Sequence, residues 1–276
     1  MPTISHALVQ AGSRGLERLD AQLLLLYALD RPLQDRAWLL SHDNEALSAS
    51  TLATFQDCVE RRALGEPLAY ITGHKDFYGL DLQVNASVLV PRPDTETLVE
   101  WALEIMQDSR NASVLDLGTG SGAIALALKA ARPDLQLSAT DSSVDALGVA
   151  RANALQHQLE VQFQQSSWLD DVAGHYHAIV SNPPYIAEGD PHLNALGHEP
   201  QAALTSGADG LHDIRQIVSQ APLHLHPGGW LLLEHGHDQA AAVRKLLAQA
   251  GLSDVQSRRD LSGIERCSGA RLPDVG

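Results

Sequence analysis

The stretch VLDLGTGSGAIALAL, residues 114–128, joins an apolar strand-like run to an alanine-rich helical run through three glycines. Glycine permits a tight turn and lets the backbone approach a ligand closely, and the N-terminus of a helix attracts an anion. Asp141 ends the next predicted strand about 20 residues further on, where an acidic side chain can accept hydrogen bonds from ribose hydroxyls. The stretch therefore predicts a nucleoside-cofactor site at the first turn of a doubly wound sheet.

The glycine turn by itself leaves the identity of the cofactor open. Gly118, Gly120 and Ala123 also satisfy the dinucleotide fingerprint G-x-G-x-x-G/A. A tight turn between a strand and a helix, with no ligand, is the plain structural alternative. The spacing to Asp141 argues against that alternative, but it does not separate one nucleoside cofactor from another.

Predicted helices and strands alternate around the glycine turn. Strands are expected at 113–117, 137–141, 161–165, 177–182 and 230–236, followed by two weaker strands near the C-terminus. This alternation predicts an α/β, Rossmann-like domain with a mostly parallel, doubly wound sheet.

The first part of the chain follows a different pattern. Residues 1–72 repeat apolar side chains at helical period, which predicts a small N-terminal helical-bundle domain. Residues 75–92 switch to period two, which predicts a β-hairpin whose turn is formed by residues 85–87. Asp94 is expected to cap the helix that follows.

The composition limits the functions that the chain can have. Its 34 acidic and 19 basic residues give a formal charge of −15, which disfavours a nucleic-acid backbone and suits a small molecule or a basic protein partner. Cys58 and Cys267 form neither a metal-ligand spacing nor a disulfide framework, so a reducing cytoplasm is expected. The N-terminal stretch is interrupted by charge and glycine, which predicts neither a signal peptide nor a membrane span. The histidines at 224–226 and 235–237 lack an organised second pair, so no metal site is expected.

A second informative stretch, SNPPY, occupies residues 181–185, and its two prolines stiffen the backbone. The side-chain oxygen of Asn182 and the carbonyl of Pro183 could each hold one hydrogen of a planar NH₂ group, with Tyr185 over the flat face of the substrate. Such a clamp aims a weakly nucleophilic amide nitrogen at a strong electrophile. The sulfonium methyl group of S-adenosyl-L-methionine meets that need, whereas a nicotinamide hydride donor has no use for the clamp. A rigid turn that merely ends a strand is the structural alternative.

Over nearly its whole length the chain resembles the bacterial peptide chain release factor N5-glutamine methyltransferases. The motifs that carry the resemblance are DAQLLLLYAL (20–29), GEPLAYITG (65–73), VPRPDTE (90–96), VLDLGTGSGAIALAL (114–128), SNPPYI (181–186), DGL (209–211) and GGWLLLEHG (228–236). The asparagine-proline motif alone would also allow adenine-N6 or cytosine-N4 methyltransferases. GEPLAYITG followed by VPRPDTE is far more specific to the release-factor family.

The resemblance implies a helical substrate-recognition domain at residues 1–72, a β-hairpin linker at 73–93, and a class I methyltransferase domain with a seven-stranded sheet at 94–276. It implies methyl transfer from S-adenosyl-L-methionine to the side-chain amide nitrogen of the glutamine in the Gly-Gly-Gln motif of class I peptide chain release factors. We therefore expect a cytoplasmic, monomeric enzyme with a protein partner, no direct contact with nucleic acid and no attachment to a membrane.

The resemblance also implies roles for individual residues. The cofactor would be bound by Gly118, Thr119, Gly120, Ser121 and Gly122 at its methionine part, by Asp141 at the ribose, by Trp168 beside the adenine, and by Asn182. The glutamine amide would be held by Asn182, Pro183, Pro184 and Tyr185, of which Asn182, Pro183 and Tyr185 would be catalytic. Asp116 would support the cofactor amine or, alternatively, cap the strand end. Glu234 is expected to be structural.

Two departures from the family pattern lie near the expected site. Ser167 stands where an acidic residue usually accepts a hydrogen bond from the adenine amino group, and His198 stands where an aromatic residue is common. Two alternatives stay open. An N6-adenine or N4-cytosine nucleic-acid methyltransferase is opposed by the charge of −15, and a non-catalytic module that binds a translation factor is opposed by the intact glycines, Asp141 and NPPY.

Overall fold

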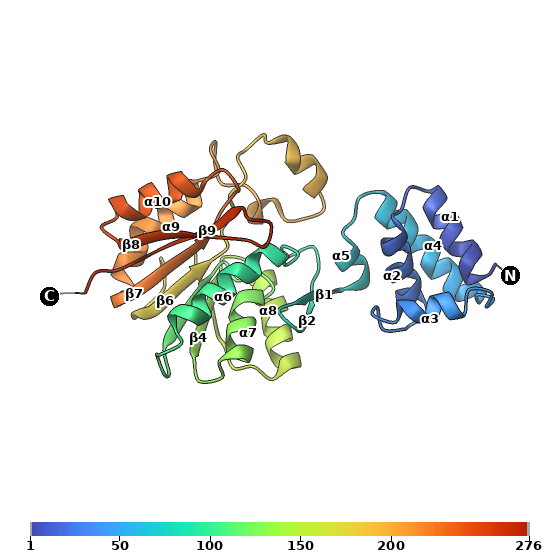
Figure 1. Ribbon diagram of the computed structural model, residues 1–276, viewed down its shortest axis with the longest axis horizontal. Helices are drawn as coiled ribbons and strands as arrows, with labels where there is room; N and C mark the ends of the chain where they lie inside the picture. The colour runs from blue at the N-terminus through green and yellow to red at the C-terminus, as the bar shows by residue number, and fades with distance from the viewer. Residues whose placement is uncertain (1, 275–276) are drawn as a thin grey trace. The chain divides into compact units, whose positions relative to one another are not determined.

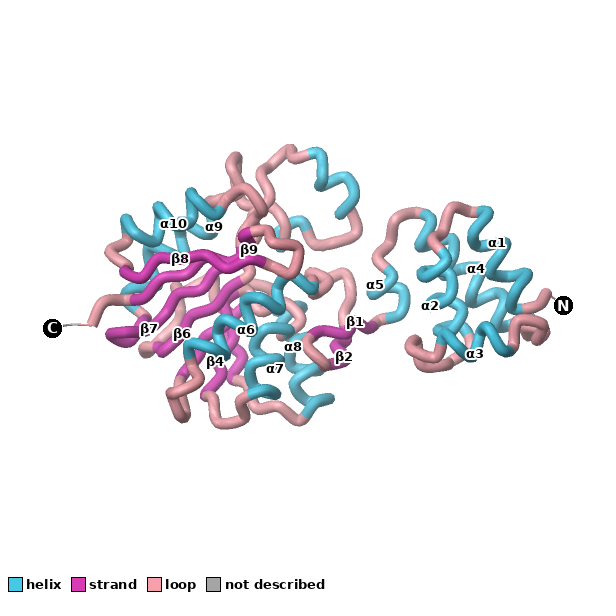
Figure 2. Tube along the Cα trace, in the orientation of Figure 1, coloured by secondary structure: helices cyan, strands magenta, loops and turns pink. Residues whose placement is uncertain are grey.

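The computed structural model describes residues 2–274 and forms two compact units, divided in sequence between His74 and Lys75. The first unit is helical (Figures 1 and 2). Its helices are α1 (Ile4–Ser13), α2 (Arg18–Ala28), α3 (Arg36–Ser41), α4 (Ala49–Ala63) and α5 (Leu68–Thr72). Their apolar faces bury a core that includes Ile4, Leu24, Leu25, Phe55 and Val59. The hydroxyl oxygens of Thr3 and Ser48 cap α1 and α4 by accepting from backbone N–H groups in the first turn. The helical N-terminal region predicted from the sequence is confirmed.

A two-stranded hairpin follows, made of β1 (His74–Phe77) and β2 (Leu80–Gln83). Its turn lies at Tyr78 and Gly79, which both have positive φ angles of 48° and 78°, as the tight two-residue hairpin turns require. The expected turn at residues 85–87 was therefore wrong. Those residues form a separate turn after β2, in which Asn85 Oδ1 accepts from the backbone of Ser87.

The second unit is built on a seven-stranded sheet. Its strands are β3 (Ser113–Leu117), β4 (Gln136–Asp141), β5 (Gln162–Gln165), β6 (Tyr176–Ser181), β7 (Leu225–Glu234), β8 (Ser253–Arg259) and β9 (Glu265–Arg271). They lie in the order β5-β4-β3-β6-β7-β9-β8. The first five in that order are parallel, whereas β9 runs antiparallel to both β7 and β8. The predicted α/β, mostly parallel fold class is confirmed.

Helices cover both faces of this sheet (Figure 1). They are α6 (Glu96–Ile105), α7 (Ala123–Ala131), α8 (Val144–His157), α9 (His212–Gln220) and α10 (Ala240–Gln249). Successive strand residues point to opposite faces. Val114 accordingly packs in one core with α6 and α7, and Leu115 packs in a second core with α9 and α10. Short 3₁₀ helices occur at η1 (Pro93–Thr95), η2 (Pro191–Leu196), η3 (Gln201–Ala203) and η4 (Ala221–Leu223).

The entry to α6 differs from the sequence-based expectation. Pro93 begins the 3₁₀ turn η1, which runs directly into α6. The N-cap residue of α6 is therefore Thr95. Asp94 does not cap α6, and the expected cap was wrong. Its carboxylate instead lies 3.3 Å from Arg266 Nε.

The order of the strands determines where a ligand can bind. The chain moves outward from β3 to β4 and β5 on one side and to β6 and β7 on the other. In open α/β sheets, ligands bind in the crevice outside the carboxyl ends of the strands at such a reversal. No helix within residues 2–274 has the length and hydropathy needed to cross a membrane.

Candidate functional site

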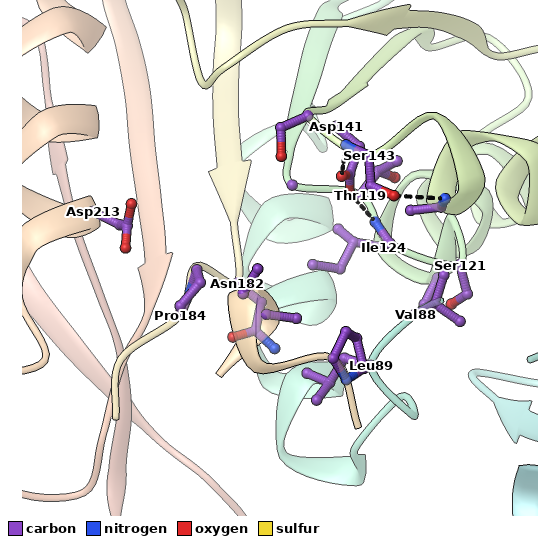
Figure 3. Close-up of a pocket in the computed structure, with 18 of the residues that line it drawn as sticks. Val88, Leu89, Thr119, Ser121, Ile124, Asp141, Ser143, Asn182, Pro184 and Asp213 are labelled. Carbon is purple, nitrogen blue, oxygen red and sulfur yellow. Dashed lines mark hydrogen bonds between the residues drawn. The ribbon is translucent and has the colours of Figure 1, made fainter. Parts of the chain in front are cut away.

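A cavity of about 420 Å³ lies at the carboxyl ends of β3, β4 and β6. Figure 3 shows Thr119, Asp141 and Ser143 on one side of it and Asp213 on the other, with Asn182 and Pro184 between them. Of the residues expected at the site, those that line the cavity are Gly118, Thr119, Gly120, Ser121, Asp141, Trp168, Asn182 and Pro184. Gly122, Pro183 and Tyr185 are not among its lining residues.

The glycine turn has the geometry that only glycine adopts readily. Gly118 and Gly120 have φ angles of +67° and +56°, in the left-handed region. A Cβ atom on Gly118 would also lie 3.2 Å from a ring carbon of Trp168. Gly122, which precedes α7, likewise has a positive φ. The turn thus brings the backbone close to the cavity and to Trp168 and directs the N-terminus of α7 towards the site.

Asp141 holds this turn in place. Its Oδ2 accepts a hydrogen bond from the Gly120 backbone at 2.9 Å, and its Oδ1 accepts from the Ser143 backbone at 2.9 Å, both drawn in Figure 3. Ser143 in turn caps α8. An ionised carboxylate offers about four acceptor positions. Asp141 lines the cavity and therefore retains acceptor capacity there beyond these two bonds.

Trp168 is held in place by Asp213, a residue that no sequence pattern singled out. Its Nε1 donates to Asp213 Oδ1 on α9 at 3.1 Å, and its own backbone has a positive φ of 49°. A large side chain in the left-handed region is uncommon and needs support from its surroundings. Asp213 and the contact with Gly118 provide that support. Asp213 lies two residues beyond the DGL motif, but no spacing in the sequence connects it with Trp168, so only the fold does.

Asn182 lines the cavity with one end of its side-chain amide held and the other free. Its Nδ2 donates to Thr95 Oγ1 at 3.2 Å. Its Oδ1 is buried and has no hydrogen-bond partner within residues 2–274. The hydroxyl of Tyr185 donates to Glu234 Oε1 at 3.5 Å, and burial raises the pKa of this tyrosine above its usual range. The stacking role of Tyr185 stays a prediction.

Glu234, at the end of β7, is buried beneath these residues. Its Oε1 accepts from the Tyr185 hydroxyl at 3.5 Å, whereas its Oε2 is buried with no hydrogen-bond partner within residues 2–274. Burial raises the pKa of its carboxyl to about 7, and the nearby charge of Asp94 acts in the same direction. The Thr95 hydroxyl, Arg266 and the Tyr185 hydroxyl lower that pKa, but by less than burial raises it.

An ion pair with one buried partner, Glu199, fixes the segment that follows β6. Glu199 is buried, pairs with Arg92 and accepts from the Val90 backbone at 3.1 Å. This pair holds the segment 186–204 against the VPRPDTE motif at the edge of the cavity. Thr95, Glu199 and Asp213 are the functional-site residues that sequence reasoning missed. Of these, only Thr95 lies inside a motif that had been singled out.

Asp116 is fully buried under the glycine turn. Its Oδ2 accepts from Thr119 Oγ1 at 2.6 Å and from the Ala125 backbone at 3.2 Å. Burial raises its pKa to about 7, with a smaller contribution from Asp141. These bonds join the end of β3 to the glycine turn and to the first turn of α7. The Oδ1 of Asp116 has no partner within residues 2–274, so a second role towards a ligand stays a prediction.

Family models and relatives identify the kind of protein to which this site belongs. The Methyltransferase small domain matches residues 95–250, and the PrmC N-terminal domain matches residues 3–73. A release factor glutamine methyltransferase of Xylella fastidiosa is 49% identical over 271 residues, covering 97% of this chain and 98% of its own. One of Burkholderia pseudomallei is 48% identical over 269 residues, covering 94% and 93%. The chain belongs to the release factor glutamine methyltransferase family.

A solved structure agrees with this assignment at the level of the fold. A methyltransferase from Pyrococcus furiosus superposes with a TM-score of 0.55 at 19% identity, covering 80% of this chain and 100% of that one. The family and the enzyme class predicted from the sequence, a methyltransferase, are confirmed.

Proposed function

We propose that this chain transfers a methyl group from S-adenosyl-L-methionine to the side-chain amide nitrogen of the glutamine in the Gly-Gly-Gln motif of a class I release factor. The observation that carries the proposal is the oxygen of Asn182, buried at the cavity and unpartnered within residues 2–274. A buried acceptor without a donor costs about 1–3 kcal/mol. A substrate that brings an N–H donor to this oxygen would recover that energy.

The residues around the glycine turn fit S-adenosyl-L-methionine. The N-terminus of α7 suits the carboxylate of the methionine part, because backbone N–H groups and the helix dipole both favour negative charge. Asp141 keeps acceptor capacity for ribose hydroxyls beyond its bonds to Gly120 and Ser143. The anchored ring of Trp168 offers a flat apolar surface for the adenine. When bound, this cofactor supplies an electrophilic methyl group on a sulfonium.

The chain itself contributes orientation to the reaction. Asn182 Oδ1 would accept one amide hydrogen of the substrate glutamine, and the Pro183 carbonyl would accept the other. The two consecutive prolines fix the backbone that carries both acceptors. Two fixed acceptors aim the amide nitrogen and favour the pyramidal geometry that it adopts as it attacks. Tyr185, anchored by its hydroxyl bond to Glu234, is proposed to flank the substrate amide.

Recognition of the release factor is proposed for the parts of the chain outside the cavity. Residues 1–72 would contact the release factor, residues 73–93 would link this domain to the rest, and residues 94–276 would carry out the transfer. A formal charge of −15 favours a basic protein surface over nucleic acid. The proposal describes a monomeric cytoplasmic enzyme.

The proposal is tested by incubating the chain with methyl-labelled S-adenosyl-L-methionine and an unmethylated class I release factor. Peptide mass spectrometry should place one methyl group on the glutamine of the Gly-Gly-Gln motif. A release factor with that glutamine replaced by asparagine is the control and should gain no label. Label on nucleic acid, or no label on the intact release factor, would overturn the proposal.

A further inference from the structure

We propose that Glu234 and Thr95 are positioning residues that determine which end of the Asn182 side-chain amide faces the cavity. The inference rests on the proposed function, since it concerns the same amide clamp. It goes beyond it by assigning a role to a buried carboxylate and a hydroxyl that do not belong to the SNPPY stretch.

The three side chains lie in series. Thr95 Oγ1 accepts from Asn182 Nδ2 at 3.2 Å, and the Thr95 hydroxyl acts on the Glu234 carboxyl, whose Oε2 is buried with no hydrogen-bond partner within residues 2–274. A threonine hydroxyl has a single proton to donate, and an ionised carboxylate can only accept. In the proposed arrangement, the Thr95 proton turns to the unpartnered Glu234 oxygen when Glu234 is ionised. The Thr95 oxygen must then accept, and only the NH₂ end of Asn182 can donate to it. This places Asn182 Oδ1 towards the cavity.

Protonation of Glu234 removes this constraint. A neutral carboxylic acid can donate to Thr95, which releases the Thr95 proton to point at Asn182. The asparagine amide can then turn over, so that its oxygen accepts from Thr95 and its NH₂ group faces the cavity. An NH₂ group there would meet the NH₂ group of a substrate glutamine, and two donors cannot pair. The clamp would be lost although no residue had moved by more than a rotation of one side chain.

The surroundings of Glu234 favour its protonation near neutral pH. Glu234 is 1% exposed, and burial raises its pKa to about 7. Cys267, opposite Glu234 on β9, has its pKa raised well above its ordinary value and is a neutral thiol. The charged and titratable groups that face Glu234 are Tyr185 on the segment after β6, Asp94 on η1, and Arg266 and Cys267 on β9.

Nuclear magnetic resonance of the side-chain amide tests the series without any reaction. The Asn182 NH₂ signals, assigned by comparison with Asn182→Asp, should shift with pH in the wild-type chain, with a midpoint near neutrality. The shift should vanish in Glu234→Gln, which has no proton to gain, and in Thr95→Val, which cannot transmit it. Asn182 signals that do not change between about pH 5.5 and 8.5 in the wild type, or that titrate unchanged in Glu234→Gln, would overturn the proposal.

Single-turnover transfer to the release factor supplies the second readout. Thr95→Val should slow methyl transfer by on the order of 10- to 100-fold, because misplacement of one positioning group has effects of this size. Cofactor affinity should change by less than about twofold. Thr95→Ser restores the hydroxyl and should regain most of the rate. Thr72→Val is the matched control, since it removes a buried threonine hydroxyl that donates to Leu68 in the N-terminal unit.

The two proposals fail in different ways. A wild-type chain that transfers no methyl group to the release factor contradicts the proposed function, while the amide signals still report on the series from Glu234 to Asn182. A chain that methylates the release factor but keeps its full rate in Thr95→Val contradicts the positioning role alone.

Discussion

The side-chain nitrogen of Asn182 donates to Thr95 Oγ1 at 3.2 Å, and the oxygen of the same amide is left buried at the cavity with no partner in residues 2–274. The two residues are 87 positions apart in sequence, and the fold brings them together where β6 ends beside the turn that begins α6. One end of the amide is thus used to hold the side chain and the other is available to a ligand. This arrangement distinguishes a site built to accept N–H groups from a rigid turn that merely ends a strand.

Replacing Asp141 should weaken cofactor binding. Asp141→Ala removes an acceptor for ribose and also the bonds to Gly120 and Ser143 that hold the turn. Loss of a hydrogen bond to a charged group typically costs about 1.5–3 kcal/mol, and calorimetry with S-adenosylhomocysteine should show a loss of at least this size. Asp145→Ala removes an exposed acid from the first turn of α8 and serves as the control. Tight NAD binding with no S-adenosylhomocysteine binding would contradict the cofactor assignment.

A methyl group on Gly118 should damage the turn. Gly118→Ala would place its Cβ 3.2 Å from the Trp168 ring at a φ of +67°. The left-handed conformation alone costs an L-residue roughly 1–2 kcal/mol, so both Tm and cofactor affinity should fall. Gly148→Ala is the matched control, because it lies in α8 with no atom within 4 Å of the added Cβ. There, alanine should stabilise the chain by about 0.4–1 kcal/mol. Equal effects of the two substitutions would show that the contact with Trp168 is unimportant.

The buried carboxyl of Glu234 should make the fold less stable as pH rises towards neutrality. Burial raises its folded pKa from 4.5 to about 7, so between these values the folded chain binds more protons than the unfolded chain. Stability falls with pH wherever that is so. Glu234→Gln cannot ionise, and its Tm relative to the wild type should therefore improve as pH is raised from about 5 to about 8, the range over which this pKa shift acts. A Tm difference that does not depend on pH would contradict the raised pKa.

The partner should be recognised as a folded protein with a basic surface. The chain carries a formal charge of −15, so methylation of a folded release factor should slow as salt is raised, because salt screens complementary charge. A short peptide containing Gly-Gly-Gln should have a much higher KM, since it lacks contacts away from the cavity. Steady-state rates on both substrates across a salt series measure this. A peptide that performs as well as the folded protein would remove the recognition role of residues 1–72.

The sequence was sufficient for the fold and for the cavity-lining motifs because those signals are local. Strand periodicity, the glycine turn and the spacing to Asp141 are each set by neighbouring residues. The hairpin turn at Tyr78 and Gly79 was missed because a tyrosine at positive φ is uncommon and the stretch at 85–87 is a stronger turn signal.

The supporting side chains could not be predicted in the same way. Asp213 reaches Trp168 across 45 positions, and Glu199 reaches the backbone of Val90 across 109. Polar side chains with such partners carry no periodicity or spacing of their own. Only the packed fold shows that Asp213 and Glu199 fix the groups around the cavity.

The single-turnover rate of Asn182→Ala, measured with its Tm, tests the central claim most directly. Loss of one preorganised acceptor should lower the transfer rate by about 10²–10³-fold. Cofactor affinity should change little, because the glycine turn and Asp141 are intact, and Tm should stay close to that of the wild type. A well-folded Asn182→Ala chain that transfers methyl groups at a near-normal rate would contradict the proposed amide clamp.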